Sequence, residues 1–177
     1  MRRQGFTIAE MIVVIAVVLI LAAAAIGGTS AITRSLRFTN TFNKLVFMVQ
    51  QARNLAVTGN NSDTKEYVVI FEQKMSPQPD TITLFRKIDD SYTIDAGDIV
   101  IEEYKILTTT NLELTLEKIA GGSCSKIIVS FQNGAAKTSL LCDDEANPNL
   151  KIGIGDGVSS NEKHFLIHEA AGIPQVL

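Results

Sequence analysis

The hydrophobic pattern changes once along this chain, from a continuous apolar run to spaced apolar positions. Residues 11–26 contain ten Ile, Leu or Val residues and no charge, and a single carboxylate, Glu10, precedes them. From Phe6 to Ile26 the run is 21 residues long, which in a helix matches the roughly 30 Å hydrocarbon core of a bilayer. The pattern predicts a membrane-spanning helix over residues 6–28.

Beyond the run, apolar residues recur at steps of three and four, which is typical of an amphipathic helix. The residues of this stripe are Phe38, Phe42, Leu45, Val49, Ala52 and Ala56. We expect the same helix to continue over residues 29–58, weakened at Gly27 and Gly28 because each glycine costs about 1 kcal/mol relative to alanine. Gly59 and the asparagines after it predict its end. The rest of the chain must bury the stripe.

Residues 59–177 have the pattern of short strands separated by polar, glycine-rich turns. The predicted strands are residues 67–71, 81–85, 99–101, 112–116, 127–131 and 165–167, with a turn at 77–80. Residues 143–149 and 153–157 are predicted to be polar and irregular. No second long helical pattern supplies parallel crossovers, so we expect an antiparallel sheet with one face on the helix. The predicted fold class is α+β.

Glu10 is the unusual residue of the apolar segment. The Ile, Leu and Val residues behind it favour insertion strongly enough to tolerate one acid. An ionisable side chain inside a membrane segment is by default a functional hypothesis, and it needs a partner. The plainer alternative is that Glu10 lies near the lipid headgroups.

The sequence around Glu10, Gly-Phe-Thr-Ile-Ala-Glu over residues 5–10, follows Arg2 and Arg3 and precedes the apolar run. It resembles the class III signal of type IV pilins and type II secretion pseudopilins. The resemblance implies that residues 1–5 are a leader, that a prepilin peptidase cuts after Gly5 and methylates the amino group of Phe6, and that Glu10 pairs with the amino terminus of a neighbouring subunit. Ile8 and Ala9 depart from the commoner Leu and Ile, and Gly27-Gly28 stands where many members have proline.

The same resemblance implies where the protein works and with which partners. The chain is expected to be a single-pass inner (cytoplasmic) membrane protein with its C-terminal domain, residues 59–177, outside the cytoplasm. Its expected partners are other pilin or pseudopilin subunits, the prepilin peptidase and the inner-membrane assembly platform, and it would be assembled into a pilus or pseudopilus. The alternative is a membrane-tethered extracytoplasmic binding domain that does not polymerise.

Two other export signals fit less well. A cleaved secretory signal has a shorter apolar core than residues 11–26 and no acid at its start. A twin-arginine signal finds support only in the Arg2-Arg3 pair itself.

A second resemblance involves the part of the chain beyond the apolar run. Residues 49–56 of the helix, the Ile-Val-Ser-Phe-Gln-Asn-Gly stretch at 128–134, and a last apolar strand followed by glycine and another short strand resemble the GspH/FimT-type minor pseudopilins and minor pilins. This resemblance implies a helix against two packed antiparallel sheets, and a place in or near the tip of a filament.

Charge and motifs exclude several functions. The net charge is −3 from 16 basic and 19 acidic residues, and loss of residues 1–5 would remove two arginines and leave −5, so no basic footprint for nucleic acid is indicated. No serine or cysteine nucleophile has a recognisable base, and no glycine loop suits a phosphate. We therefore predict a protein that is not an enzyme and has no cofactor.

Candidate metal ligands are present but poorly spaced. His164 and His168 fall on a predicted strand, where a spacing of four separates them by more than about 13 Å. Two groups of acids lie in predicted loops: Asp89, Asp90, Asp95 and Asp98, and Asp143, Asp144, Glu145 and Asp156. Neither group has the spacing of an EF-hand loop, so solvated acidic loops are favoured and calcium is the less favoured alternative.

The chain has two cysteines, Cys124 and Cys142, an even count that suits one disulfide in an oxidising compartment. Two buried free thiols are the alternative. A two-residue type I′ turn at Asn133-Gly134 aligns the apolar faces of the hairpin but leaves the cysteines one residue out of register. A three-residue loop over 132–134 places them directly opposite, and a bulge near the strand ends would reconcile the two. The sequence leaves the register open.

Overall fold

A computed structural model describes residues 7–59, 66–75, 77–89, 94–95, 97–106, 112–133, 138–155, 162–170 and 172–177, and within the helix it leaves the side chains of residues 24–31 undescribed. The chain divides into two compact units, Met1–Arg37 and Phe38–Leu177. Each unit is described by itself.

A single helix, α1, runs from Ile8 to Thr58. The apolar segment and the amphipathic segment therefore form one helix, as the periodicity predicts. In the second unit the predicted stripe is buried together with Met48. The helix ends where expected, because the Gly59 amide donates to the Leu55 carbonyl at 2.6 Å and a Cβ at Gly59 would come within 2.4 Å of that oxygen.

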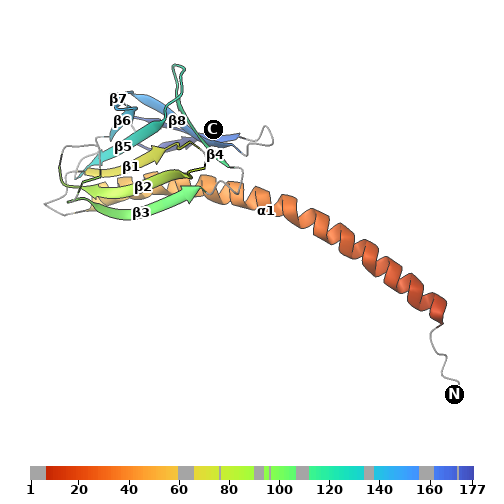
Figure 1. Ribbon diagram of the computed structural model, residues 1–177. Helices are drawn as coiled ribbons and strands as arrows, with labels where there is room; N and C mark the ends of the chain where they lie inside the picture. The colour runs from red at the N-terminus through yellow and green to blue at the C-terminus, as the bar shows by residue number, and fades with distance from the viewer. Residues whose placement is uncertain are drawn as a thin grey trace. The chain divides into compact units, whose positions relative to one another are not determined.

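The second unit contains two antiparallel sheets (Figure 1). The six-stranded sheet has the order β3-β2-β1-β5-β6-β7 and consists of β1 (Glu66–Glu72), β2 (Asp80–Lys87), β3 (Ile99–Ile106), β5 (Lys126–Gln132), β6 (Thr138–Cys142) and β7 (Glu145–Ala146). The four-stranded sheet has the order β10-β9-β8-β4 and consists of β4 (Glu113–Lys118), β8 (Asn149–Gly155), β9 (Glu162–His168) and β10 (Pro174–Val176). The predicted α+β class, a helix packed on antiparallel sheets, is confirmed.

One hydrophobic core joins the helix to both sheets. It includes Leu45 of α1, Val69 of the six-stranded sheet and Ile152 of the four-stranded sheet. The Phe165 ring meets Phe42 of the helix edge-on at 6.0 Å between ring centroids, and Phe71 of the six-stranded sheet at 6.4 Å. Burial of large aromatic and aliphatic side chains from all three elements fixes the helix against the strands.

Both registers considered for the β5–β6 hairpin are wrong. Val129 lies opposite Leu140, and Ile127 opposite Cys142, a shift of two residues from the type I′ alternative. Because side chains alternate with a period of two, this shift keeps the same apolar residues on the core face, so the hydrophobic pattern cannot distinguish the two registers. The tight turn with positive φ lies instead at Asp143 (50°) and Asp144 (68°), between β6 and β7.

The prediction of irregular chain over residues 143–149 and 153–157 holds for 143–144 and 147–148 but is wrong where strands form. Residues 145–146 form β7 and residues 149–155 form β8. Leu150, Ile152 and Ile154 alternate along β8 and are fully buried, which is the pattern of a half-buried strand. The glycines between them suggested a loop, but Gly153 leaves room for the side chain of a neighbouring strand.

Candidate processing and assembly site

The helix begins with a capping box formed by Thr7 and Glu10. The Thr7 amide and hydroxyl donate to Oε2 of Glu10 at 2.8 and 3.0 Å, and the Glu10 amide donates to Oγ1 of Thr7 at 3.3 Å. Thr7 is thus the N-cap and Glu10 the third helical residue, and each satisfies an amide that the helix leaves unpaired. The T-x-x-E pattern in the sequence could have predicted this local role for Thr7.

The two oxygens of the Glu10 carboxylate have different environments. Both bonds from Thr7 reach Oε2. Within the described part of the chain, Oε1 accepts no hydrogen bond. The capping box therefore holds the carboxylate at the start of the helix with one oxygen open to a further donor.

The side chains behind Glu10 are exposed on every side of the helix. All residues from Ile8 to Ala23 are exposed within the chain, and the run includes Ile15, Leu19 and Ile20. A helix that is apolar all round is stable only when lipid or protein surrounds it. Among the described residues, no helix is both long enough and apolar enough to cross a membrane. The membrane span over residues 6–28 stays a prediction.

Gly5 and Phe6 lie outside the described residues. Cleavage after Gly5 and methylation of Phe6 therefore stay predictions.

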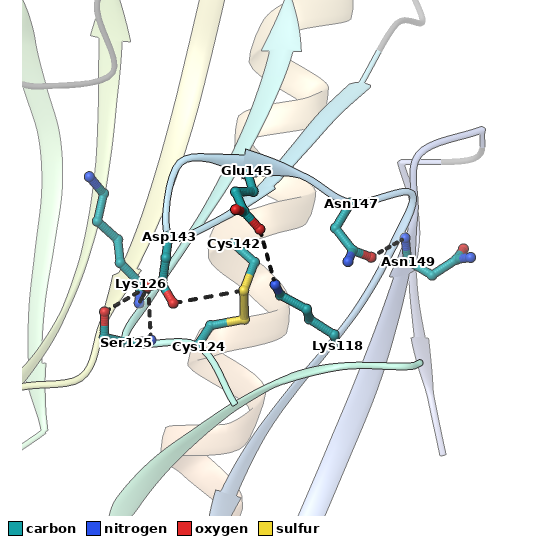
Figure 2. Close-up of a disulfide and its surroundings, with 9 residues drawn as sticks. All are labelled: Lys118, Cys124, Ser125, Lys126, Cys142, Asp143, Glu145, Asn147 and Asn149. Carbon is teal, nitrogen blue, oxygen red and sulfur yellow. Dashed lines mark hydrogen bonds and ion pairs between the residues drawn. A yellow bond between two sulfur atoms is a disulfide. The ribbon is translucent and has the colours of Figure 1, made fainter. Parts of the chain in front are cut away.

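The predicted disulfide between Cys124 and Cys142 is present, with the two Cα atoms 5.6 Å apart (Figure 2). Cys142 ends β6 of the six-stranded sheet, whereas the Cys124 amide donates to the Leu116 carbonyl of β4 at 2.8 Å. The covalent bond therefore ties the two sheets together.

Asp143 accepts several hydrogen bonds beside the disulfide (Figure 2). Its Oδ1 accepts hydrogen bonds from the Ser125 hydroxyl at 2.6 Å and from the amides of Ser125 and Lys126, both at 2.9 Å. These bonds stabilise the carboxylate and lower the pKa of Asp143, and the bond from the Ser125 hydroxyl has the largest effect. Desolvation opposes them. Asp144 forms an ion pair with Lys126 at 3.3 Å, and Glu145 forms one with Lys118 at 3.4 Å.

Two acids of the other group bind a lysine. Lys87 is only 1% exposed, and its ammonium lies 2.8 Å from Asp89 and 3.4 Å from Asp98, whose side chain is fully buried. Burial disfavours the charge of Lys87, but the bond to Asp89 and the field of Asp98 outweigh it and raise the pKa of Lys87. Asp98 also accepts the Asp95 amide at 3.0 Å. Asp89 and Asp98 thus bind the ammonium of Lys87, while Asp90 and Asp156 lie outside the described residues.

The two histidines lie on β9, as predicted, and each has its own partner. Nε2 of His164 lies 3.1 Å from Glu162, and Nδ1 of His168 contacts Oδ1 of Asn149. Across the described residues, the group of His, Cys, Asp and Glu atoms within ligand distance is Cys124, Cys142 and Asp143. Its two sulfurs are bonded to each other, so it does not form a metal site.

Comparison with known proteins identifies the N-terminal segment. The family model of the prokaryotic N-terminal methylation motif matches residues 1–26. No curated protein and no solved structure matches the chain. The match supports the predicted class III signal and a type IV pilin-like protein processed at its N-terminus.

Proposed function

We propose that this chain is a structural subunit, a minor pilin or pseudopilin, of a type IV pilus-like filament or a type II secretion pseudopilus. The observation that carries the proposal is the methylation motif over residues 1–26, at the head of a helix with exposed apolar side chains on every side from Ile8 to Ala23. Lipid would cover this surface before assembly, and helices of neighbouring subunits would cover it afterwards. The helix packed on two antiparallel sheets supports the GspH/FimT-type subgroup.

Processing would leave the capping box intact. Cleavage after Gly5 converts the nitrogen of Phe6 into an amine, but the nitrogen of Thr7 stays an amide. The bonds from Thr7 to Glu10 therefore need nothing from the leader. The prepilin peptidase would produce a capped helix with a cation, the methylated amine of Phe6, directly before it.

In the assembled filament, Glu10 would pair with the Phe6 amine of a neighbouring subunit. A carboxylate among apolar helices is tolerated when it is neutralised or paired. The open Oε1 of Glu10 can accept the amine while Oε2 continues to cap the helix. Such a pair would fix the axial register between subunits, because apolar packing alone allows sliding.

Mass spectrometry of the N-terminal peptide tests the processing step. Chains from cells with the peptidase are expected to begin at N-methylated Phe6, and chains from cells without it at Met1. A chain that begins at Met1 in both strains, or beyond Ala25, would contradict the assignment.

A Glu10→Ala variant tests the assembly step. We expect normal leader cleavage and membrane insertion but a reduced fraction of the variant in sheared filaments relative to the membrane pool. Glu113→Ala, which removes an exposed acid of β4, is the matched control and is expected to behave as wild type. Incorporation of Glu10→Ala at the wild-type level would show that Glu10 is not the pairing group, whereas absence of the wild-type chain itself from sheared filaments would favour a tethered domain that does not polymerise.

A further inference from the structure

Lys87 and Asp98 form an ion pair in which both side chains are buried. Lys87 ends β2, and Asp98 directly precedes β3. Since Arg86 lies opposite Ile99 in the β2–β3 pairing, Lys87 and Asp98 are the next residues outward on the two antiparallel strands. Their side chains are 1% and 0% exposed, whereas the lysines of the other ion pairs in the described part of the chain are 24% to 53% exposed. Water is thus kept from this pair far more than from the others.

Two charges buried in contact are unfavourable to maintain. Each ion loses its hydration on burial, and the attraction between the two offsets this loss only in part. Phe85 lies two residues before Lys87 on the same face of β2, is fully buried, and has its ring centroid 5.9 Å from Nζ. The ring excludes water from this side of the nitrogen. A neutral amide in the same place would have no charge to desolvate.

The carboxyl group of Asp98 is held by backbone amides at both oxygens. The Ile88 amide donates to Oδ1 at 3.4 Å, and the Asp95 amide donates to Oδ2 at 3.0 Å. Nζ of Lys87 lies 3.4 Å from the same Oδ2. Fixed donors of this kind stabilise the negative charge that develops on oxygen when a nucleophile attacks a carboxyl carbon. The site therefore holds a nitrogen nucleophile in contact with a polarised carboxyl group.

Asp89 is placed to move protons between the two groups. Its Oδ1 lies 2.8 Å from Nζ of Lys87, and its side chain is 47% exposed. A carboxylate at hydrogen-bond distance from a reacting nitrogen can take its proton and deliver it to a leaving oxygen. Because Asp98 is shielded from water and Asp89 is not, an amide of Asp98 would be protected from hydrolysis. Asp98 is therefore the electrophile and Asp89 the proton carrier.

We propose that Lys87 and Asp98 condense to an amide bond between their side chains, with Asp89 as the catalytic base and acid. Asp89 takes a proton from the ammonium of Lys87, and the amine attacks Cγ of Asp98. The new N–C bond forms as negative charge develops on Oδ2, and the bond from Cγ to Oδ1 then breaks. Oδ1 leaves as water with two protons, both from Nζ and both delivered through Asp89. Ammonium and carboxylate thus become amide and water, and no further reactant is needed.

The bond would fasten an end strand of the six-stranded sheet. In the described part of the chain, β3 pairs with β2 alone (Figure 1). Holding the two groups in contact replaces an encounter between separate molecules, which is the main obstacle to such a condensation. A covalent link at the start of β3 would keep this strand on β2 when the chain is unfolded or pulled.

Mass spectrometry of the intact, unfolded full-length chain tests the proposal. We expect the major wild-type species to be lighter by one water than its sequence requires, after the disulfide and any N-terminal processing are counted. Lys87→Arg and Asp98→Ala each remove a reacting group and should have the full mass. Asp89→Asn keeps both reacting groups and should also have the full mass. Loss of the water in Asp89→Asn would contradict the catalytic role of Asp89.

Lys87→Arg also separates the proposed bond from a succinimide, in which an aspartate loses one water to its own backbone. A succinimide needs no lysine, so Lys87→Arg would retain that loss. Lys151→Arg is the matched control, because Lys151 has an equally short ion pair, at 2.8 Å, but is 29% exposed. It should lose the same water as wild type.

Peptide mapping locates the bond. Cleavage after Asp89 and Asp95 separates Lys87 from Asp98 in an unlinked chain, whereas in a linked chain the two peptides stay together and fragment as one ion. A wild-type chain of full mass, or a water loss that Lys87→Arg retains, would overturn the proposal. The result does not depend on the proposed filament role, since the reacting groups all belong to one chain.

Discussion

Gly153 in the middle of β8 is a position where the structure predicts a sharp effect of a single added methyl group. A Cβ at Gly153 would lie 2.1 Å from Nδ1 of His164 and 2.6 Å from Oγ1 of Thr115. These residues are its direct neighbours on β9 and β4. Gly155 occupies the same face two residues on, but its nearest neighbour there is Cγ of Glu162 at 3.7 Å. The two glycines form a matched pair in one strand.

The two substitutions should have opposite signs. Replacing glycine by alanine restricts the unfolded chain and stabilises by about 0.4 to 1 kcal/mol where the new side chain fits. Gly155→Ala has room and should show this gain. Gly153→Ala forces the His164 ring off the strand and away from Glu162, and overpacking of this kind costs about 1 to 3 kcal/mol. The net effect expected for Gly153→Ala is a destabilisation of about 1 to 2 kcal/mol.

Denaturant unfolding of the full chain in detergent measures both variants. The Gly153→Ala/His164→Ala double variant should be less destabilised than the sum of the two single variants, because His164→Ala removes the nearer of the two clashing atoms. Gly153→Ala with a free energy of unfolding equal to or above that of wild type would refute the packing argument.

Three further predictions concern the same domain. Cys124→Ala/Cys142→Ala removes a cross-link between residues 18 apart in sequence and should lower the free energy of unfolding by about 3 kcal/mol, and reductant should then destabilise wild type but not the variant. Asp143→Asn keeps a residue type that tolerates positive φ but loses the carboxylate. Folding lowers the pKa of Asp143, so its carboxylate contributes fully to the free energy of unfolding above the unfolded pKa near 3.9. This contribution is lost as pH falls through the folded pKa. The stabilities of wild type and variant should therefore converge during acid unfolding below about pH 4. Leu45→Ala on the fully buried face of α1 should cost about 2 to 5 kcal/mol, whereas Phe47→Ala, at a side chain that is 52% exposed, should change stability by about 0.5 kcal/mol or less.

The helix was predictable to within a residue at its C-terminal end because its signals agree. The stripe from Phe38 to Ala56 keeps one period over five turns, and Gly59 directly follows the last helical residue, Thr58. Local propensity, periodicity and the stop signal all support the same structure. The capping box at Thr7 and Glu10 carried an equally local signal in the sequence.

The strand register was not predictable because the signals that set it are not local. Alternation of apolar residues fixes which face each side chain occupies, but a shift of two residues preserves that face. Asn133-Gly134 is a strong turn signal, yet Phe131 pairs with Thr138, so the five residues 133–137 join β5 to β6. Glycines in β8 suggested a loop, and the packing of His164 and Thr115 from the two neighbouring strands explains why Gly153 lacks a side chain.

The capping box also clarifies what different substitutions of Glu10 test. In the proposed assembly this side chain has two tasks: Oε2 caps its own helix, and Oε1 receives the amine of a neighbour. Alanine removes both tasks, whereas glutamine keeps an oxygen that can accept from Thr7, since Glu and Gln both serve in capping boxes, and loses only the charge. If the ion pair limits assembly, Glu10→Gln is expected to enter filaments as poorly as Glu10→Ala, with cleavage unchanged in both. If the cap limits assembly, Glu10→Gln incorporates like wild type while Glu10→Ala does not, and the proposed pairing with the amine of Phe6 fails.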